Sequence, residues 1–412
     1  MKKRVVITGM GALTPVGNNL AETWNSLVNG VSGVDTITSF DTSALSVKIA
    51  AQIKDFKADE HFDPKEARKM DAYTHYALVA AREAIRDAGI DPAVQNGKRV
   101  GVITGVGIGG IYTFEEETIK SHVHGPRRIS PFFIPKMISN IAAAHIAIEH
   151  GFKGPNFSIT SACASANHAI GTAFRTIQYG DADIIISGGA EAGVTSLGMG
   201  GFCALRALST RNDDPKGASR PFDIGRDGFV MSEGAAFLVL EELEHAKARG
   251  ARIYAELVGY AATDDAHHIT APLEDGSGSA DAMRGAISDA GLQPSDIQYV
   301  NSHGTSTPLN DKGETISLKS CFGDHAYKLK INSTKSMVGH MLGAAAGIEA
   351  IVCVKTIETG ILHPTINLTD PDPDCDLDYV PLTAQKFEVT NALSNSLGFG
   401  GHNSAIVVRR YV

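Results

Sequence analysis

The chain has 412 residues, of which 43% are hydrophobic and 20% charged, and its formal net charge is −9. This composition is typical of a globular protein with a large core, organised as two or three domains or as one large duplicated domain. The negative charge argues against nucleic acid as a general partner. No run approaches 18 continuous apolar residues, so we expect no membrane span. The apolar run at 5–7 is too short for a secretion signal. Five cysteines, an odd number without metal-ligand spacing, predict reduced thiols, a cytoplasmic location and no metal site.

Short β-branched runs alternate with alanine-rich runs along the chain, which is typical of an α/β protein with buried sheets. The runs predict strands at 4–8, 100–104, 156–160, 183–187, 235–240, 254–258, 299–302, 328–333 and 404–409. They predict helices at 21–27, 64–88, 164–179, 279–290 and 343–359. A strand, a turn and a helix ending in glycine occur at 156–180 and again at 330–360, which is a weak sign of an internal repeat.

Positive charge gathers at the start of the predicted helix 64–88. With Asp63 as the N-cap, the spacing places Lys65, Arg68 and Lys69 on one helix face. Lys65 and Arg68 lie where the helix dipole prefers acids, so helix stability does not favour them. Further basic residues are Arg127, Arg128 and Arg206. A face of this kind is usually solvated surface, and the alternative is a docking patch for an acidic partner.

Cys163 lies in the segment SACAS at 161–165, where a strand is expected to pass into a helix. The dipole and free N–H groups of a helix N-terminus favour a thiolate, and the small neighbours leave room for an acyl group. The alternative is a small buried hydrophobe. That second interpretation is kept for Cys203, Cys321, Cys353 and Cys375.

Two histidines have comparable settings near strand ends. His303 follows the apolar run 299–300 and precedes Gly304 and three hydroxyl-bearing residues, while His340 follows KSMVG at 335–339. An isolated histidine is more often satisfied by backbone hydrogen bonds, so neither motif alone identifies a site. A thiolate can hold an acyl group, and two imidazole N–H groups can hold an enolate, so the three residues make chemical sense together.

Glu349 is the lone charge in the small, apolar segment 343–352. A buried carboxylate without a cation is very costly, so we expect Lys335, in the loop before this helix, to be its partner. The pair is either purely structural or part of the site.

Glycine-rich segments at 107–110 and 398–401 suggest that backbone approaches a ligand or another backbone. The first is not followed by Lys-Ser or Lys-Thr, so a phosphate-binding Walker A loop is excluded. The second surrounds Phe399 after the strand-like run 395–397, which suggests a mobile ring and an exposed N–H, although a simple turn has the same pattern.

Jointly, these motifs resemble the β-ketoacyl-acyl carrier protein synthases, and the resemblance runs almost end to end. It is closest to the elongating type II enzymes of bacterial fatty acid synthesis. The resemblance implies a duplicated thiolase fold, a five-layer α-β-α-β-α sandwich with halves at 1–250 and 251–412, and a homodimer. It implies no cofactor, because the substrates are carried on the phosphopantetheine arm of acyl carrier protein.

The resemblance also implies a role for each motif. Cys163 would carry the acyl group, with its own N–H and that of Phe399 as the oxyanion hole, and His303 and His340 would hold the enolate of the malonyl thioester. Lys335 and Glu349 would organise these histidines and ordered water. Substrate-binding residues would be Ile108, Phe202, Thr305, Thr307 and Gly400, and the basic residues named above would dock the carrier protein. Departures from the usual pattern are His402, Val338 and Ser302.

Three alternatives share parts of this pattern. A degradative thiolase is disfavoured, because the segment 394–404 lacks the second cysteine that such enzymes use. The chain-length partner subunit of polyketide systems is disfavoured because it lacks the nucleophile. A ketosynthase of a type II polyketide or related secondary-metabolite pathway has the same triad and stays open.

Overall fold

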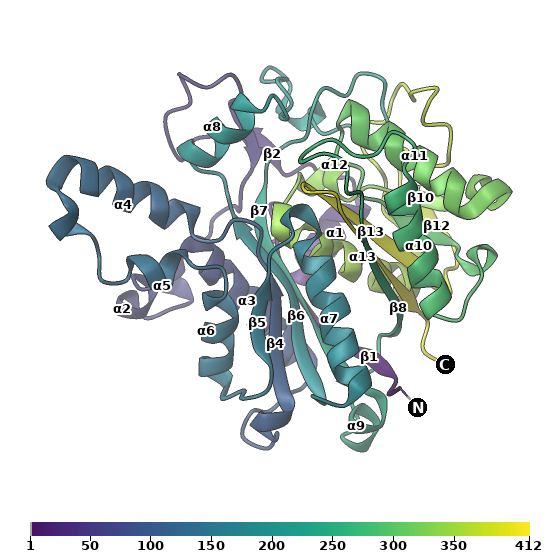
Figure 1. Cartoon of the computed structure of the whole chain (residues 1–412), viewed down its shortest axis with the longest axis horizontal. Coiled ribbons are helices and arrows are strands. Elements are labelled where there is room, and N and C mark those ends of the chain that lie inside the picture. Colours follow the sequence, from purple (N-terminus) through teal and green to yellow (C-terminus); the bar gives the residue numbers. More distant parts are fainter. Residues whose placement is uncertain (1) are drawn as a thin grey trace.

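The computed structural model describes residues 2–412, whose central feature is a ten-stranded sheet in the order β10-β9-β13-β14-β8-β1-β7-β6-β4-β5 (Figure 1). The first half of the chain contributes β1 (Val5–Leu13), β4 (Val100–Gly105), β5 (Asn156–Ile159), β6 (Ile184–Ala192) and β7 (Glu233–Glu242). The second contributes β8 (Ala255–Asp264), β9 (Tyr299–Asn301), β10 (Lys330–Asn332), β13 (Asn391–Gly398) and β14 (His402–Arg409). All the strands predicted from the sequence are confirmed, with shifted ends.

The two halves repeat one topology. Numbered in chain order within each half, the strands follow the order 3-2-4-5-1 twice, with the same parallel and antiparallel neighbours. A short antiparallel pairing of β1 with β8, from Val5 opposite Leu257 to Ile7 opposite Ala255, joins them. The duplication implied by the resemblance is confirmed, while the boundary at residue 250 stays a prediction.

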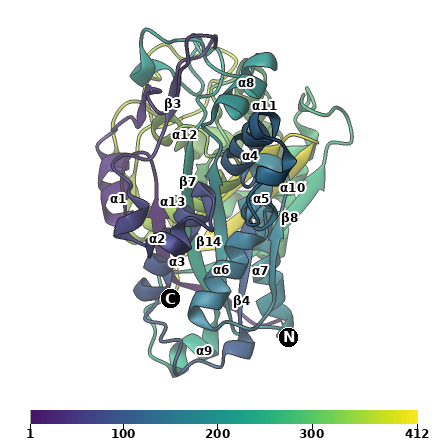
Figure 2. The same ribbon diagram turned by 90° about the vertical axis from the view of Figure 1, so that its left-hand side faces the viewer.

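The five strands of each half form one sheet layer, called the first and the second sheet below, and helices form three layers around the two (Figures 1 and 2). α3 (Ala72–Asp87) covers the outer face of the first sheet, and α10 (Ser277–Asp289), backed by α11 (Pro308–Phe322), covers the second. Between the sheets, α7 (Ser165–Tyr179) packs on α13 (Ala345–Thr359), and both contact strands of the two halves. A helix in this middle layer must be small and apolar all round, which explains the composition of α13. The five-layer arrangement is therefore confirmed.

The remaining elements surround these layers. They are α1 (Leu20–Val28), β2 (Val34–Thr36), β3 (Ile49–Ala51), α2 (Pro64–Ala67), α4 (Ile111–His124), α5 (Phe133–Met137), α6 (Ile141–His150), α8 (Ser196–Ala204), α9 (Leu243–Ala248), α12 (Lys335–Val338), β11 (Ile361–Leu362) and β12 (Gln385–Lys386). α4 and α5 project from the left edge in Figure 1 and face the viewer in Figure 2. Within residues 2–412, no helix combines the length and apolarity needed to cross a membrane.

The weak repeat seen in the sequence has a structural basis. Each half has a short 3-10 turn before its middle-layer helix, entered through a residue with positive φ, Ala162 at 50° and Leu342 at 47°. Both helices have 15 residues and end at a left-handed glycine, Gly180 or Gly360. In the second half, α12 and His340 separate the strand from this turn, so the repeat is not continuous.

The single helix predicted at 64–88 is wrong. The chain leaves helical geometry after α2 and re-enters it at α3, because Asp71 caps α3 by accepting from Tyr73 N–H at 3.3 Å. The same carboxylate accepts from the N–H and hydroxyl of Thr113 on α4, a tertiary contact that fixes the break. Asp63 does cap α2 as expected.

Candidate active site

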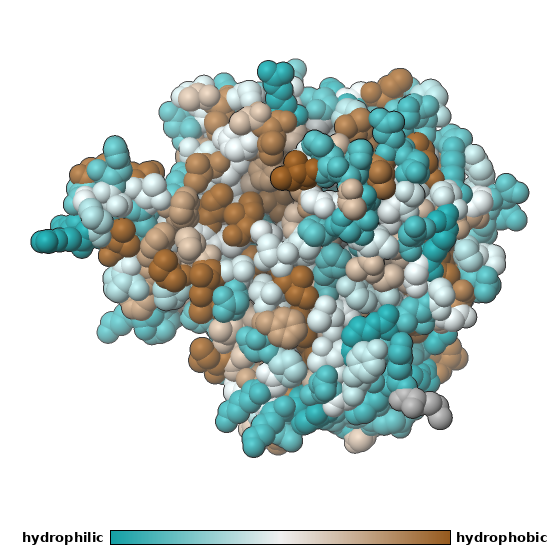
Figure 3. Space-filling model, in the orientation of Figure 1, coloured by the Kyte–Doolittle hydropathy of each residue, from teal (hydrophilic) through white to brown (hydrophobic). Residues whose placement is uncertain are grey.

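A cavity of about 640 Å³ opens between the two halves and contains the predicted cysteine and both histidines. The sulfur of Cys163 and ring nitrogens of His303 and His340 lie within 4.8 Å of one another. Ile108, Phe202, Thr305 and Thr307 also line this cavity, as do Leu342 and Phe229, which the sequence did not single out. Apolar residues gather on the face shown in Figure 3 between the regions of α8 and α11.

Cys163 lies in the 3-10 turn Ala162–Ala164 at the N-terminus of α7, as the sequence predicted. The turn is held by Ser165, whose hydroxyl donates to the Ala162 carbonyl at 2.7 Å and accepts from Ser161 N–H at 2.9 Å. Gly398 packs against it so closely that a Cβ there would lie 2.6 Å from the Ser161 carbonyl oxygen. The turn therefore presents the sulfur to the cavity at a fixed position.

The resting state of Cys163 differs from the sequence expectation of a thiolate. Burial raises the pKa of the thiol to about 12 and outweighs the opposing effects of the Lys335 charge and of the N–H groups of Phe399 and Cys163 itself. Both N–H groups belong to residues that line the cavity, so they are candidates for stabilising an oxyanion there. The direction of this shift favours the thiol form in the resting protein.

His303 follows β9, and a buried carboxylate fixes its backbone. The N–H groups of His303 and Gly304 donate to the two oxygens of Glu314 at 2.6 and 2.7 Å, and the Asn395 amide donates to the same carboxylate at 2.9 Å. The ring is buried, and Lys335 Nζ lies 3.3 Å from its Nδ1. Because an ammonium can only donate, Nδ1 accepts and Nε2 carries the ring proton.

His340 has the same tautomer as His303, with its ring proton on Nε2, but different partners hold it. Its backbone N–H donates to the Val230 carbonyl at 2.7 Å, and Nδ1 of its ring accepts from Leu342 N–H at 3.3 Å. Burial lowers the pKa of both histidines well below the usual value, and the Lys335 charge lowers them further. The two rings stand 5.4 Å apart at 87°. Both are therefore neutral near pH 7, and each keeps one N–H to donate.

Lys335 and Glu349 form the ion pair that the sequence predicted. Both side chains are 1% exposed, and Lys335 Nζ donates to Glu349 Oε1 while also contacting His303. Burial raises the pKa of Glu349, and the Lys335 charge opposes that rise. The ammonium thus lies between a carboxylate that holds it and the imidazole that it orients.

A cysteine with two histidines also suits a zinc ion, so the fit of the site to a metal has to be considered. Metal-bound histidines usually donate their second N–H to a carboxylate or carbonyl. Here both Nδ1 atoms face donors, the Lys335 ammonium and Leu342 N–H, and the ammonium would repel a cation. The arrangement fits an anionic oxygen better than a metal.

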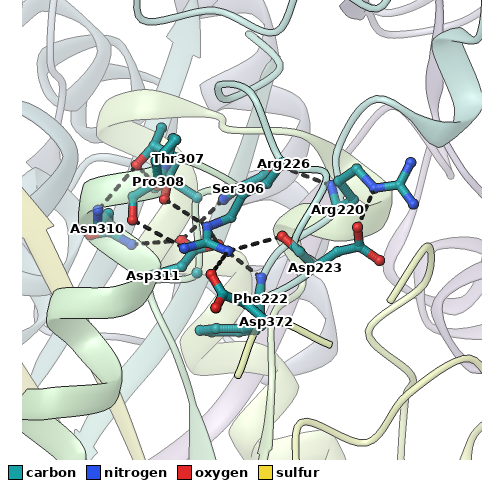
Figure 4. A network of polar contacts seen from close by, with 12 residues as sticks. Arg220, Phe222, Asp223, Arg226, Ser306, Thr307, Pro308, Asn310, Asp311 and Asp372 are labelled. Carbon is teal, nitrogen blue, oxygen red and sulfur yellow. Dashed lines mark hydrogen bonds and ion pairs between the residues drawn. The ribbon is translucent and has the colours of Figure 1, made fainter. Parts of the chain in front are cut away.

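The segment that carries Thr305 and Thr307 is fixed by the buried polar network in Figure 4. Ser306 has a φ of 68°, and its N–H donates to Asp311 at 3.2 Å. Arg226 donates to the Thr307 carbonyl at 3.3 Å and lies 3.8 Å from Asp311. The hydroxyls of Thr305 and Thr307 lie 3.0 Å apart and line the cavity, so they are placed to contact a ligand that enters it.

Two sets of predicted residues are only partly brought to the cavity. Gly400 lies at the exposed hairpin turn, where its N–H donates to the Ile269 carbonyl at 2.7 Å, and Gly401 lines the cavity in its place. Among the basic residues, Arg206 lines the cavity. The residues of the basic set that lie elsewhere on the surface are Lys65, Arg68, Lys69, Arg127 and Arg128.

The predicted basic stripe is not on one helix face. α2 ends at Ala67, so Arg68 is its C-cap and Lys69 lies beyond the helix. Lys69 pairs with Glu66 at 2.7 Å and lies 6.0 Å from the Phe132 ring. Lys65 and Arg68 are exposed. The residues form an irregular basic surface, and their docking role stays a prediction.

Two buried carboxylates at the site were missed in the sequence. Glu314 holds the backbone of His303, and Glu191 accepts N–H groups from the segment Gly107–Gly109. Glu191 had a visible signal, because it is the lone charge in the buried strand β6, as Glu349 is in the segment 343–352. Glu314 had none, because polar residues surround it in α11.

Comparison with known proteins gives a consistent result over the whole chain. Residues 2–246 match the family model "Beta-ketoacyl synthase, N-terminal domain", and residues 254–369 match "Beta-ketoacyl synthase, C-terminal domain". The chain is 53% identical to 3-oxoacyl-[acyl-carrier-protein] synthase 2 of Staphylococcus aureus (strain COL), with 99% of each chain covered. It is 50% identical to the protein of the same name from a Synechocystis species, covering 100% of this chain and 99% of the other.

A solved structure supports the same assignment. A type II polyketide ketosynthase, bound to a hexaketide and in complex with its acyl-carrier protein, superposes with a TM-score of 0.93 at 37% identity and full coverage of both chains. The family resemblance read from the sequence motifs is confirmed. With both family models matched and the Cys-His-His cluster at the cavity between its two halves, the chain belongs to the β-ketoacyl synthase family.

Proposed function

We propose that this protein is a 3-oxoacyl-acyl-carrier-protein synthase, an acyltransferase that extends fatty acyl chains by two carbons through decarboxylative condensation. The observation that carries the proposal is a cysteine thiol beside two neutral imidazoles, each held as an N–H donor, in one cavity. Relatives of this name match the chain along its full length.

The first half-reaction loads the acyl group onto Cys163. The sulfur attacks the acyl-carrier thioester, and the N–H groups of Cys163 and Phe399 stabilise the tetrahedral oxyanion. When the intermediate collapses, the carbon–sulfur bond to the carrier breaks, and the cysteine's proton passes to the departing pantetheine thiolate. The exchange is balanced without a separate base, which suits a cysteine that rests as a thiol.

The second half-reaction forms the carbon–carbon bond. Malonyl-carrier protein loses CO2, and the electron pair left behind becomes an enolate whose oxygen accepts the N–H groups of His303 and His340. The enolate carbon attacks the acyl-cysteine, the carbon–sulfur bond breaks, and the Cys163 thiolate takes a proton from solvent. Lys335 keeps His303 in the donor tautomer throughout. The reaction needs no cofactor beyond the carrier-bound pantetheine arm, for which Thr305 and Thr307 are the proposed contacts.

Acyl carrier protein and a second copy of this chain are the proposed partners. The related ketosynthase in complex with its acyl-carrier protein supports the first, and the exposed side chains of Lys65, Arg68 and Arg206 offer positive charge on a chain of net charge −9. For the homodimer, β5 is an edge strand with Phe157 40% exposed, and Ile148 of the adjoining α6 is 77% exposed. All five cysteines are free thiols, which supports a cytoplasmic location.

A ketosynthase of polyketide synthesis is the second candidate, favoured by the hexaketide-bound relative. Incubation with acyl- and malonyl-carrier proteins, followed by mass spectrometry, separates the two. Fatty acid elongation gives an acyl-Cys163 adduct and one product two carbons longer, whereas a polyketide enzyme adds repeated unreduced units. Cys353→Ala, a buried cysteine on α13, is the matched control and should behave as wild type. Folded protein that forms no adduct and no product would overturn the proposal.

A further inference from the structure

Glu191 is a buried carboxylate with an unusual set of partners. It lies on β6 and is 0% exposed. It accepts the backbone N–H groups of Gly107 at 2.8 Å, Ile108 at 3.2 Å, Gly109 at 3.2 Å and Gly343 at 3.1 Å. One side chain thus joins three consecutive residues of the first half to the turn before α13 in the second half.

The packing around Glu191 leaves no room for another arrangement. A Cβ on Gly107 would lie 2.6 Å from Glu191 Oε2, and a Cβ on Gly343 would lie 2.8 Å from it and 2.1 Å from Gly107 N. Both positions therefore require glycine. Two backbone segments contact the carboxylate directly, so a substitution of Glu191 would alter the position of both.

The internal duplication relates the turn that Glu191 contacts to the turn that carries Cys163. Gly343 has in the second half the position of Cys163 in the first, because each follows a positive-φ residue in the 3-10 turn before a middle-layer helix. In the first half, the N–H at this turn belongs to Cys163 itself and lowers the pKa of its thiol. In the second half, the Glu191 carboxylate occupies the corresponding N–H, which is favourable for an anion at a helix N-terminus.

The segment that Glu191 holds forms a wall of the cavity. Ile108 lines it, and its Cδ1 and that of Leu342 converge beside Gly193. We propose that Glu191 is a positioning residue that fixes the Ile108 wall through its backbone hydrogen bonds and so sets which acyl chains Cys163 accepts. This inference rests on the proposed function and names the specificity of the same site.

The energetics are consistent with a role beyond folding. Burial raises the pKa of Glu191 to about 7 although four N–H groups oppose the rise. Because the folded pKa is higher than the unfolded one, the charge of Glu191 costs folding free energy as the pH rises towards 7, so the burial of this charge is not explained by stability. Within the site, burial is the main cause of the raised pKa of Cys163, and the Glu191 charge adds to it.

Glu191→Gln tests the proposal with nearly the same volume. The amide nitrogen of glutamine would face N–H donors, so some of the backbone hydrogen bonds to this side chain are lost. The Ile108 segment is then free to move. We expect the ratio of kcat/KM for long against short acyl-carrier substrates to rise about tenfold, the factor that corresponds to one hydrogen bond to a charged group. The matched control is Glu233→Gln, a buried carboxylate with its pKa also raised to about 7, held by Ile53 N–H and not part of the cavity lining.

A double-mutant cycle with Ile108→Ala shows whether Glu191 acts through that residue. If it does, the two changes alter the chain-length ratio by less than the product of their separate effects. An unchanged ratio in Glu191→Gln, or independent effects in the cycle, would overturn the inference. If Glu191→Gln does not fold, Glu191→Asp, which keeps the charge but shortens the reach, replaces it in the same cycle with the same criterion. Failure of the proposed function is distinct, because wild type would then form no acyl-Cys163 at any chain length.

Discussion

Replacing Lys335 by methionine separates the structural role of the buried ion pair from its effect on His303. Methionine matches the length of lysine and removes the charge. Lys335 and Glu349 are each 1% exposed, and removing one partner of such a pair typically costs about 3–5 kcal/mol of unfolding free energy. The penalty should grow with pH above about 4.3, because Glu349 without Lys335 has a further raised pKa in the folded state and must either take up a proton or stay charged and unpaired.

The catalytic consequence has a different origin. Without the ammonium at Nδ1, His303 is no longer restricted to the tautomer that carries its proton on Nε2. Losing one preorganised donor to an oxyanion typically lowers the rate by about 10²–10³. We therefore expect malonyl-carrier protein decarboxylation, assayed without an acyl primer, to fall by about that factor, while loading of Cys163 changes less.

A second variant removes the stability effect. Lys335→Met with Glu349→Leu replaces the pair by apolar groups, which is often neutral or stabilising, so denaturant midpoints should recover while decarboxylation stays about 10²-fold low. Lys355→Met is the matched control, since it removes a lysine paired with Glu358 on the same helix. Decarboxylation at the wild-type rate in the folded double variant would refute the view that Lys335 orients His303.

Four further outcomes are expected. Cys163→Ala should fold but give no covalent adduct by mass spectrometry, and an adduct on another cysteine would contradict the assignment. His340→Ala should slow decarboxylation by about 10²–10³ and affect acylation less, as measured by single-turnover kinetics. Because burial raises the pKa of Cys163 to about 12, its alkylation rate should still be increasing at pH 9, whereas a plateau near pH 7 would show a resting thiolate. Lys65→Glu with Lys69→Glu should raise KM for carrier-bound but not for small thioesters, with a penalty that shrinks once salt shortens the Debye length below about 8 Å.

The strands and middle-layer helices were predictable because burial on both faces leaves a strong pattern in the sequence. β6 and residues 345–354 of α13 are almost wholly small or apolar, and such runs are not typical of surface elements. The break between α2 and α3 was not predictable. It depends on the contact of Asp71 with Thr113 of α4, which is distant in sequence, and local helix propensity continues through it.

The site was predictable to the extent that its chemistry is visible in residue types. The lone charge of Glu349 predicted its ion pair with Lys335, and the same argument applied to β6 would have found Glu191. The resting state of Cys163 could not be obtained this way. A helix N-terminus predicts a thiolate, but enclosure by residues from both halves reverses the direction of the pKa shift.

Duplication gave this fold two equivalent helix N-termini, and the two now serve opposite purposes. At α7, the corresponding N–H is that of Cys163, which is the proposed donor to the oxyanion that develops during the reaction. At α13, a resident carboxylate satisfies the corresponding N–H, so no substrate oxygen can use it. An unfilled, buried N–H there would be costly. Glu191 satisfies it and uses the second N-terminus to support a wall of the cavity that the first one serves.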